Sequence, residues 1–142
     1  MNRFTKISNT GKDLKDTAKK WNAVRDNTTG LIWSARNVGK EQLSHAKADA
    51  AAKAVDLCGA SDWRLPTVEE LFCLADRTRS TPAIDTAFFK CHSSWYWSSS
   101  AVAGGPDYAW GVDFYYGYSD YGNRYDTAFV RAVRGPVAVP GQ

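Results

Sequence analysis

Patterns typical of strands and of helices occupy separate parts of this 142-residue chain. Strand-forming residues at 23–25 and 31–34 flank a turn rich in Asn, Thr and Gly, helical patterns follow between residues 41 and 75, and residues 94–135 are again rich in strand formers. A parallel sheet needs strands and helices in alternation, whereas segregated runs are typical of the α+β class. We therefore expect an early hairpin, two helices and a mixed, mainly antiparallel sheet with a long irregular C-terminal β region.

The second helix has the clearest start signal. Thr67 is followed three residues later by Glu70, a spacing typical of a capping box, and Pro66 directly precedes Thr67. A helix is therefore predicted to begin after Pro66. Its buried stripe is expected to consist of Leu71, Phe72, Leu74 and Ala75.

The first helical pattern spans residues 41–58. Apolar side chains recur along it at helical spacing, and Gly59 stands where a helix would end. The buried face is expected to consist of Leu43, Ala46 or Lys47, Ala50, Ala54, Leu57 and Cys58.

The length and composition fit a single globular domain. Hydrophobic residues make up 44% and charged residues 23% of the chain, which is typical of folded rather than disordered proteins. We expect a loosely attached N-terminal arm or edge strand in residues 1–20, the domain proper in residues 21–136 and a tail in residues 137–142. The apolar runs are too short to cross a membrane, and no secretory signal is recognised at the start. These features predict synthesis in the cytoplasm and no membrane insertion.

The charges of the chain do not favour a nucleic-acid partner. The net charge is only +3, and the basic excess is dispersed through the first two-thirds of the chain, where Lys90 is the last lysine. Dispersed charges are typical of a solvated face, whereas binding to nucleic acid needs a concentrated basic patch.

The cysteines and histidines do not show the spacing of a zinc site. Cys58 and Cys73 are expected to be core thiols in helices and Cys91 a loop thiol, and a disulfide between two of the three stays open. The neighbours Cys91 and His92 raise the alternative of an enzyme with thiol chemistry. Adjacent residues on a strand point to opposite faces, however, so His92 as the base would not reach the Cys91 thiol as the nucleophile.

The tyrosines are concentrated in one part of the chain. All seven lie between Tyr96 and Tyr125, and six lie between Tyr108 and Tyr125, whereas Trp and Phe are spread over the whole chain. Tyrosine combines a large rigid contact area with a hydroxyl group, and Gly, Ser and Asn add adaptable hydrogen bonds, a mixture typical of recognition loops. This composition favours a binding surface. The alternative is a tyrosine-decorated hairpin whose rings shelter the sheet.

Alternation within this part predicts a strand with one buried face. Trp110, Val112 and Phe114 alternate with Gly111, Asp113 and Tyr115. The first three side chains are expected to face the core.

Six motifs resemble, in their order, segments of a known family. They are "VRDNTTGLIW", "SDWRLPTVEEL", "PAID", "YWSSS", "AWGVDF" and "FVRAVRG". They are similar to the C-type-lectin-like fold of bacterial and phage variable proteins, of the formylglycine-generating-enzyme-like subclass. The resemblance is strongest to the target proteins of diversity-generating retroelements, which include phage tail receptor-binding proteins. It covers about residues 21–135.

The resemblance implies a division between scaffold and variable positions. In that family a C-terminal region is rewritten by reverse transcription, and asparagine-type codons yield Tyr, Ser, Asp, Gly or Asn, which places a variable, hypervariable region at about residues 98–134. The scaffold would then include Trp97, Trp110, Val112, Phe114, Gly117, Phe129, Val130 and Arg131. The variable, ligand-binding positions would be Gly111, Tyr115, Tyr116, Tyr118, Ser119, Asp120, Tyr121, Gly122, Asn123, Tyr125 and Asp126. Further candidates are Ser100, Asp107 and Tyr108.

The function implied is ligand binding without catalysis. The ligand would be a protein or glycan on a cell surface, and the chain would act in surface display or, incorporated into a virion, on a phage tail. This hypothesis predicts that the rings of Tyr115, Tyr116, Tyr118, Tyr121 and Tyr125 are exposed and share one face. The family includes monomers and trimers, so the oligomeric state stays open. The alternative is an assembly module whose aromatic face is a subunit interface.

Two other groups with this fold do not match the chain. Calcium-dependent lectins carry Glu-Pro-Asn or Gln-Pro-Asp loops, which are absent here, and Asp113, Asp120 and Asp126 are loosely spaced for a calcium site. Formylglycine-generating enzymes depend on cysteines late in the chain, and no cysteine follows Cys91. We therefore expect no metal, no cofactor and no enzymatic activity.

Overall fold

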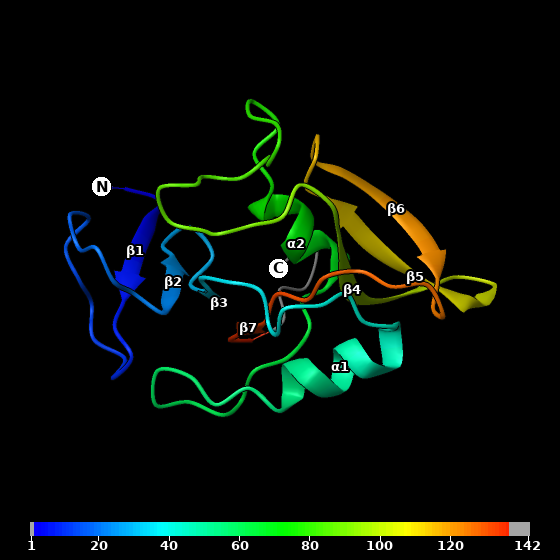
Figure 1. Ribbon diagram of the computed structural model, residues 1–142, viewed down its shortest axis with the longest axis horizontal. Coiled ribbons are helices and arrows are strands. Elements are labelled where there is room, and N and C mark those ends of the chain that lie inside the picture. Colours follow the sequence, from blue (N-terminus) through cyan, green and yellow to red (C-terminus); the bar gives the residue numbers. More distant parts are fainter. Residues whose placement is uncertain (1, 137–142) are drawn as a thin grey trace.

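The chain folds as an α+β protein with two helices, as predicted (Figure 1). The computed structural model describes residues 2–136, so the expected tail at 137–142 lies outside the described residues. The strands are antiparallel, as mainly expected, and they are divided between two sheets. Within residues 2–136, the parallel pairing is an isolated bridge between Tyr96 and Phe129.

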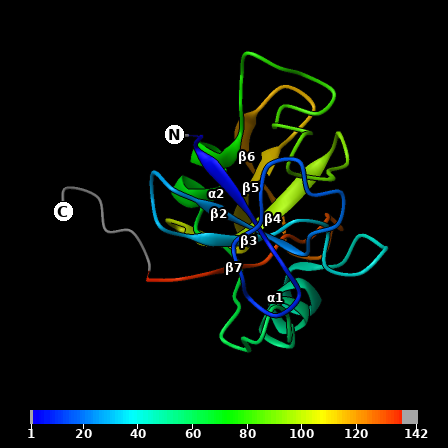
Figure 2. The ribbon, with the colours of Figure 1, turned by 90° about the vertical axis from the view of Figure 1, so that its left-hand side faces the viewer.

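The first sheet joins the two ends of the domain. Its strands are β1 (Phe4–Ile7), β2 (Ala23–Asp26), β3 (Ile32–Ser34) and β7 (Val133–Arg134), in the order β1-β2-β3-β7. Figure 2 shows this sheet from its own side of the molecule. The hairpin of β2 and β3 confirms the early hairpin expected from the sequence.

The N-terminal segment is more firmly attached than expected. β1 is an edge strand, as predicted, but Phe4 and Ile7 are only 6% and 3% exposed and belong to the core. The Lys6 ammonium donates hydrogen bonds to two backbone carbonyls of the same segment, and it lies 3.9 Å from the ring centre of Trp21. These contacts correct the expectation of a loose arm.

The second sheet contains the tyrosine-rich part of the chain. It consists of β4 (Trp95–Val102), β5 (Gly105–Asp113) and β6 (Tyr118–Asn123), in that order, so β6 is an edge strand. In Figure 1 this sheet lies on the opposite side of α2 from β1 and β2. β5 pairs with β6 over six residues, from Tyr108 opposite Asn123 to Asp113 opposite Tyr118.

Two apolar cores cover the two faces of this second sheet. Tyr96 and Val112 pack in a cluster with Leu71 and Leu74 of α2 (Val68–Leu74). The opposite face carries Trp97 and Ala109, which pack in a second cluster with two alanines of α1 (His45–Lys53). β5 is therefore buried on both faces at its centre, not on one face as its alternation predicted.

The first helix is shorter than expected and buries a different face. α1 begins at His45 and ends at Lys53, and Gly59 belongs to a separate turn with positive φ. Its buried residues are His45, Ala48 and Ala52, whereas the expected positions Ala46, Ala50 and Ala54 are exposed. Alanines occur all round this helix, so apolar spacing alone does not select a face. The bulky Leu43 and Leu57 lie outside the helix and are half-buried.

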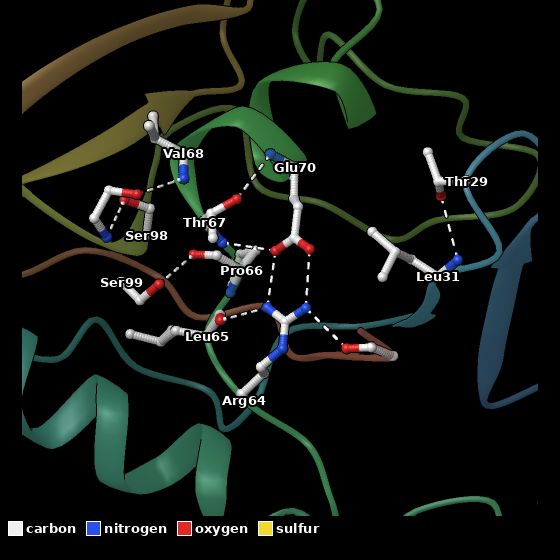
Figure 3. A network of polar contacts seen from close by, with 12 residues as sticks. Thr29, Leu31, Arg64, Leu65, Pro66, Thr67, Val68, Glu70, Ser98 and Ser99 are labelled. Carbon is white, nitrogen blue, oxygen red and sulfur yellow. Dashed lines mark hydrogen bonds and ion pairs between the residues drawn. The ribbon is translucent and has the colours of Figure 1, made fainter. Parts of the chain in front are cut away.

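The second helix begins as predicted. The Thr67 side chain accepts a hydrogen bond from the Glu70 backbone, and the Glu70 carboxylate accepts one from the Thr67 backbone, which confirms the capping box. Glu70 also binds both terminal nitrogens of Arg64, at 2.8 and 2.9 Å (Figure 3). Leu71 and Leu74 are buried as expected, whereas Phe72 and Ala75 are half-buried.

Residues at the start of α2 also form hydrogen bonds with segments that are distant in the sequence. Arg64 donates to the carbonyl of Gly135, just after β7. The backbone N–H of Val68 donates to the Ser100 hydroxyl of β4. Arg64, which is bound to Glu70, and Val68 at the helix start therefore connect α2 to both sheets.

All three thiols are free, and two lie elsewhere than expected. Cys73 is on the exposed side of α2, and Cys58 is half-buried in a turn with φ of 55°. Burial raises the pKa of the Cys58 thiol, partly countered by the positive charge of Arg134. Cys91 lies in a loop, as predicted.

Candidate functional site

Six exposed tyrosines form the candidate site, and we call them the tyrosine surface. They are the exposed large hydrophobic side chains of residues 2–136: Tyr108, Tyr115, Tyr116, Tyr118, Tyr121 and Tyr125. Their exposed fractions range from 39% to 83%. The seventh tyrosine, Tyr96, is buried in the core. These tyrosines belong to β5, to the turn between β5 and β6, to β6 and to the loop that follows it, segments that Figure 1 shows side by side.

Five of the six rings form two groups, and the sixth, Tyr125, is the most exposed at 83%. Tyr116 contacts Tyr115, with ring centres 4.6 Å apart, and Tyr118, with ring centres 5.9 Å apart. Tyr121 packs edge-on against Tyr108 and Trp110, with ring centres 5.5 and 5.6 Å away. These separations are typical of favourable aromatic pairs.

The strand register places the two groups on opposite faces of the sheet. Tyr121 is paired with Trp110, and Tyr118 is paired with Asp113. Residues three apart on a strand point to opposite faces. The prediction that the rings are exposed is confirmed, but the prediction that they share one face is wrong. The tyrosine surface wraps around the edge strand β6.

Polar side chains hold the turns that present these rings. The Asp113 carboxylate accepts from the backbone N–H of Tyr115, and Gly117 completes this turn with φ of 90°. At the end of β6, the Asn123 side chain accepts from the backbone N–H of Tyr125. Asn123 was expected to bind ligand, but its side-chain oxygen here fixes the loop.

Gly111 corrects the predicted site. It is buried in the central strand, and a Cβ at this position would lie 2.7 Å from the backbone oxygen of Tyr96. No side chain fits there unless the backbone moves, so Gly111 does not present variable side chains. Gly122 differs, because a Cβ there would lie 3.7 Å from the Trp97 ring, an ordinary contact on an edge strand.

The other candidates lie around the tyrosine surface. Ser119, Asp120 and Asp126 are exposed, while Gly122 and Asn123 are half-buried. Sequence reasoning missed Trp110, which was assigned to the buried scaffold but is half-exposed and contacts Tyr121. Its alternation with Val112 predicted burial. Its contact with Tyr121 results from the pairing of β5 with β6, which is not visible in a single strand.

The pair Cys91 and His92 is not arranged as a nucleophile and its base. The His92 ring is stacked on Phe129, with ring centres 4.1 Å apart and planes within 6°. The Cys91 thiol lies 3.3 Å from the backbone carbonyl of His92. Within residues 2–136, no group of three His, Cys, Asp or Glu residues is placed to hold a metal ion.

His45 connects α1 to the loop after β6. A neutral ring with its hydrogen on Nε2 donates to the Ser98 carbonyl at 2.8 Å and accepts at Nδ1 from Arg124 at 3.0 Å. Burial holds the pKa of His45 below its usual range. The Ser98 carbonyl opposes this shift and the positive charge of Arg124 adds to it.

We expect His45 to make the stability of the protein fall below about pH 6.5. A lowered pKa in the folded state means that the unfolded chain binds the proton more readily. The contribution of neutral His45 is therefore complete above the unfolded pKa and is lost as the pH falls below it. Urea unfolding at several pH values should show that the free energy of unfolding falls more steeply with decreasing pH for the wild type than for His45→Gln. The glutamine side chain keeps a donor and an acceptor but does not titrate. Equal pH slopes would contradict this role.

The fold and site together define a class: a small α+β domain with an exposed, tyrosine-rich edge. The chain belongs to the Lcl C-terminal domain family, whose family model matches residues 22–134. The match covers nearly all of the domain proper expected from the sequence. Comparison with curated proteins and with solved structures found no match. No helix within the described residues is long and apolar enough to cross a membrane.

Proposed function

We propose that this protein binds a ligand through the tyrosine surface and performs no catalysis. The observation that carries the proposal is that six of the seven tyrosines are exposed and lie together around β6, where solvent-exposed rings contribute little to the core. Exposed aromatic patches mark contact surfaces, and tyrosine is enriched where proteins bind one another. The ligand is a protein or a glycan on a cell surface.

We propose further that the exposed positions are diversified by a retroelement. Tyr115 and Tyr116 in the turn and the exposed residues of the edge strand β6 carry side chains that the core does not use. These positions therefore tolerate exchange among Tyr, Ser, Asp, Gly and Asn. Buried Gly111 does not tolerate it. A phage or bacterial surface is the setting in which such a diversified receptor-binding protein acts.

The proposed function predicts different tolerance at exposed and buried positions. One displayed library would randomise exposed positions with the same five residue types: Tyr115, Tyr116, Tyr118, Tyr121 and Tyr125. A matched control library would randomise buried positions of the same segment: Gly111, Val112, Phe114 and Gly117. The surface library should stay folded and yield binders against several target proteins, because its side chains make few core contacts. Most members of the control library should not fold, since Gly111→Ala alone is expected to lower the free energy of unfolding by about 1–3 kcal/mol.

Two results would overturn this proposal. In the first, the surface library unfolds as readily as the control library. In the second, binders are selected but their affinity is unchanged when Tyr116 and Tyr118 are returned to serine. A contribution to binding predicts a loss of about tenfold or more for such anchors. The source genome adds a check on diversification, because a near-copy of the DNA for residues 98–134 should differ at adenines and lie beside a reverse transcriptase.

A second candidate function is assembly through the same surface. It is favoured by the position of β6, an edge strand without lysine or proline whose outer hydrogen-bonding groups face no other strand. Such edges readily pair with another chain. Mass measurement in solution distinguishes the two functions: if serine at Tyr116, Tyr118 and Tyr121 abolishes an oligomer but leaves ligand binding intact, the surface is a subunit interface.

A further inference from the structure

A small cavity lies on one face of the tyrosine-bearing sheet, and one residue of the tyrosine surface, Tyr121, belongs to its lining. Its volume is about 250 Å³, and its lining includes Trp95, Trp97, Gly111, Gly122 and Asp126. Pockets for whole small molecules are commonly about 300–1,000 Å³. This cavity is therefore of a size for one side chain of a larger ligand.

The two glycines leave the space that the cavity occupies. A Cβ on Gly111 would lie 3.4 Å from Cε3 of Trp95, and a Cβ on Gly122 would lie 3.7 Å from Cη2 of Trp97. A side chain at Gly122 would fill the gap between the strand and the Trp97 ring, whereas a Cβ at Gly111 would already lie 2.7 Å from the backbone oxygen of Tyr96. The cavity thus exists because both strands carry glycine beneath tryptophans.

The aromatic floor of the cavity is rigid. The indole N–H of Trp97 donates to the Leu43 carbonyl at 2.8 Å, and the His45 ring packs edge-on against the indole at 5.2 Å. Trp97 is almost fully buried. A ligand group that enters the cavity therefore meets rings that are already in place, which lowers the cost of binding.

The charge around the cavity is negative. Asp126 lines it, and within residues 2–136 its carboxylate takes part in no ion pair. Asp120 is exposed on β6, and its even spacing from Gly122 places it on the cavity face. No lysine or arginine lines the cavity. The nearby Arg124 is already bound to His45 and to the Tyr108 carbonyl.

We propose that this cavity takes an arginine side chain of a protein ligand. A guanidinium is planar, packs on tryptophan rings and pairs with a carboxylate, so it matches both the indole floor and Asp126. This inference rests on the proposed ligand-binding function and adds one specific contact to it. A Cβ at Gly122 would make only an ordinary contact, so a larger residue there is expected to close the cavity and abolish binding of the arginine side chain.

The test uses small probes and the full chain. N-acetyl-arginine methylamide would be titrated into ¹⁵N-labelled protein, with N-acetyl-citrulline methylamide as the neutral probe of the same shape and the phenylalanine amide as an apolar probe. The arginine probe should shift the amide signals of Gly111 and Gly122 and the indole signal of Trp97, and should saturate in roughly the millimolar range. The citrulline probe should bind at least about fivefold more weakly.

Three variants complete the test. Gly122→Val should abolish the shifts while the protein stays folded, and Asp126→Asn should weaken binding of the arginine probe by about fivefold. Asp56→Asn is the matched control, because Asp56 is exposed and does not line the cavity; it should change nothing.

The outcomes separate this inference from the proposed function. The inference is overturned if the arginine probe causes no shifts at these three sites, if citrulline or phenylalanine binds equally well, or if Gly122→Val binds like the wild type. In each case the library selections can still succeed, so ligand binding by the tyrosine surface stands. Conversely, if arginine binding is saturable and the selected binders keep their affinity without Tyr116 and Tyr118, the cavity stands and the binding role of these two tyrosines is rejected.

Discussion

Replacing Glu70 by alanine is expected to lower the free energy of unfolding by about 3–4 kcal/mol. The Glu70 side chain is 1% exposed, and its carboxylate accepts from both terminal nitrogens of Arg64 and from the backbone N–H of Thr67. Alanine would leave a guanidinium in a largely buried place without its carboxylate and would remove half of the capping box. Because Arg64 also holds the segment after β7, the loss affects both sheets.

The neighbouring residue provides the control for this prediction. Glu69 lies in the same helical turn but is exposed, so Glu69→Ala should change the free energy of unfolding by no more than about 0.5 kcal/mol. Glu70→Gln should fall between the two, since it keeps an acceptor for Thr67 but not the charge. Urea unfolding followed by circular dichroism measures all three. Similar losses for Glu69→Ala and Glu70→Ala would show that the network does not stabilise the fold.

Replacing Arg131 by alanine is expected to destabilise the protein by about 4 kcal/mol. Arg131 is 0% exposed and donates to the carbonyls of Ser34 and Lys90, each at 2.6 Å. Its guanidinium also lies over the rings of Phe89 and Tyr96, at 5.3 and 5.5 Å from their centres. Alanine would leave the two carbonyls without these donors and would open a cavity in the core.

Methionine at the same position separates packing from hydrogen bonding. Arg131→Met retains most of the side-chain volume but donates to neither carbonyl. It should therefore lower the free energy of unfolding by a measurable amount, but clearly less than Arg131→Ala does. Thermal and urea unfolding of the two variants provide the comparison. If Arg131→Met is as stable as the wild type, the two hydrogen bonds make no net contribution, as happens for some buried charges that apolar residues replace.

Features that depend on neighbours in the sequence were predicted well. The capping box needs only Thr67 and Glu70, and the early hairpin needs only its turn residues, so both followed from local conformational preferences. The limits of α1 were wrong because its alanines fit several helical faces. Which alanines are buried depends on the tryptophans and strands packed against them, and these come from other parts of the chain.

The candidate site was predicted in composition but not in geometry. The exposed tyrosines were recognised because their crowding is unlike that of core residues. Their division between two faces follows from the pairing of Tyr118 with Asp113 and of Tyr121 with Trp110. Register is set by contacts between strands, so a list of residue types does not determine it.

Gly111 and Gly122 show which features the sequence determines by itself and which depend on the tertiary structure. The sequence determined the α+β class, the start of α2 and the place of the tyrosine-rich surface, because each depends on residue type and local spacing. It presented the two glycines as equivalent. Only the tertiary structure separates them, since the Tyr96 carbonyl closes the space above Gly111 and the edge position of β6 leaves room above Gly122. The space around a residue is set by distant segments of the chain, and these meet only when the protein folds.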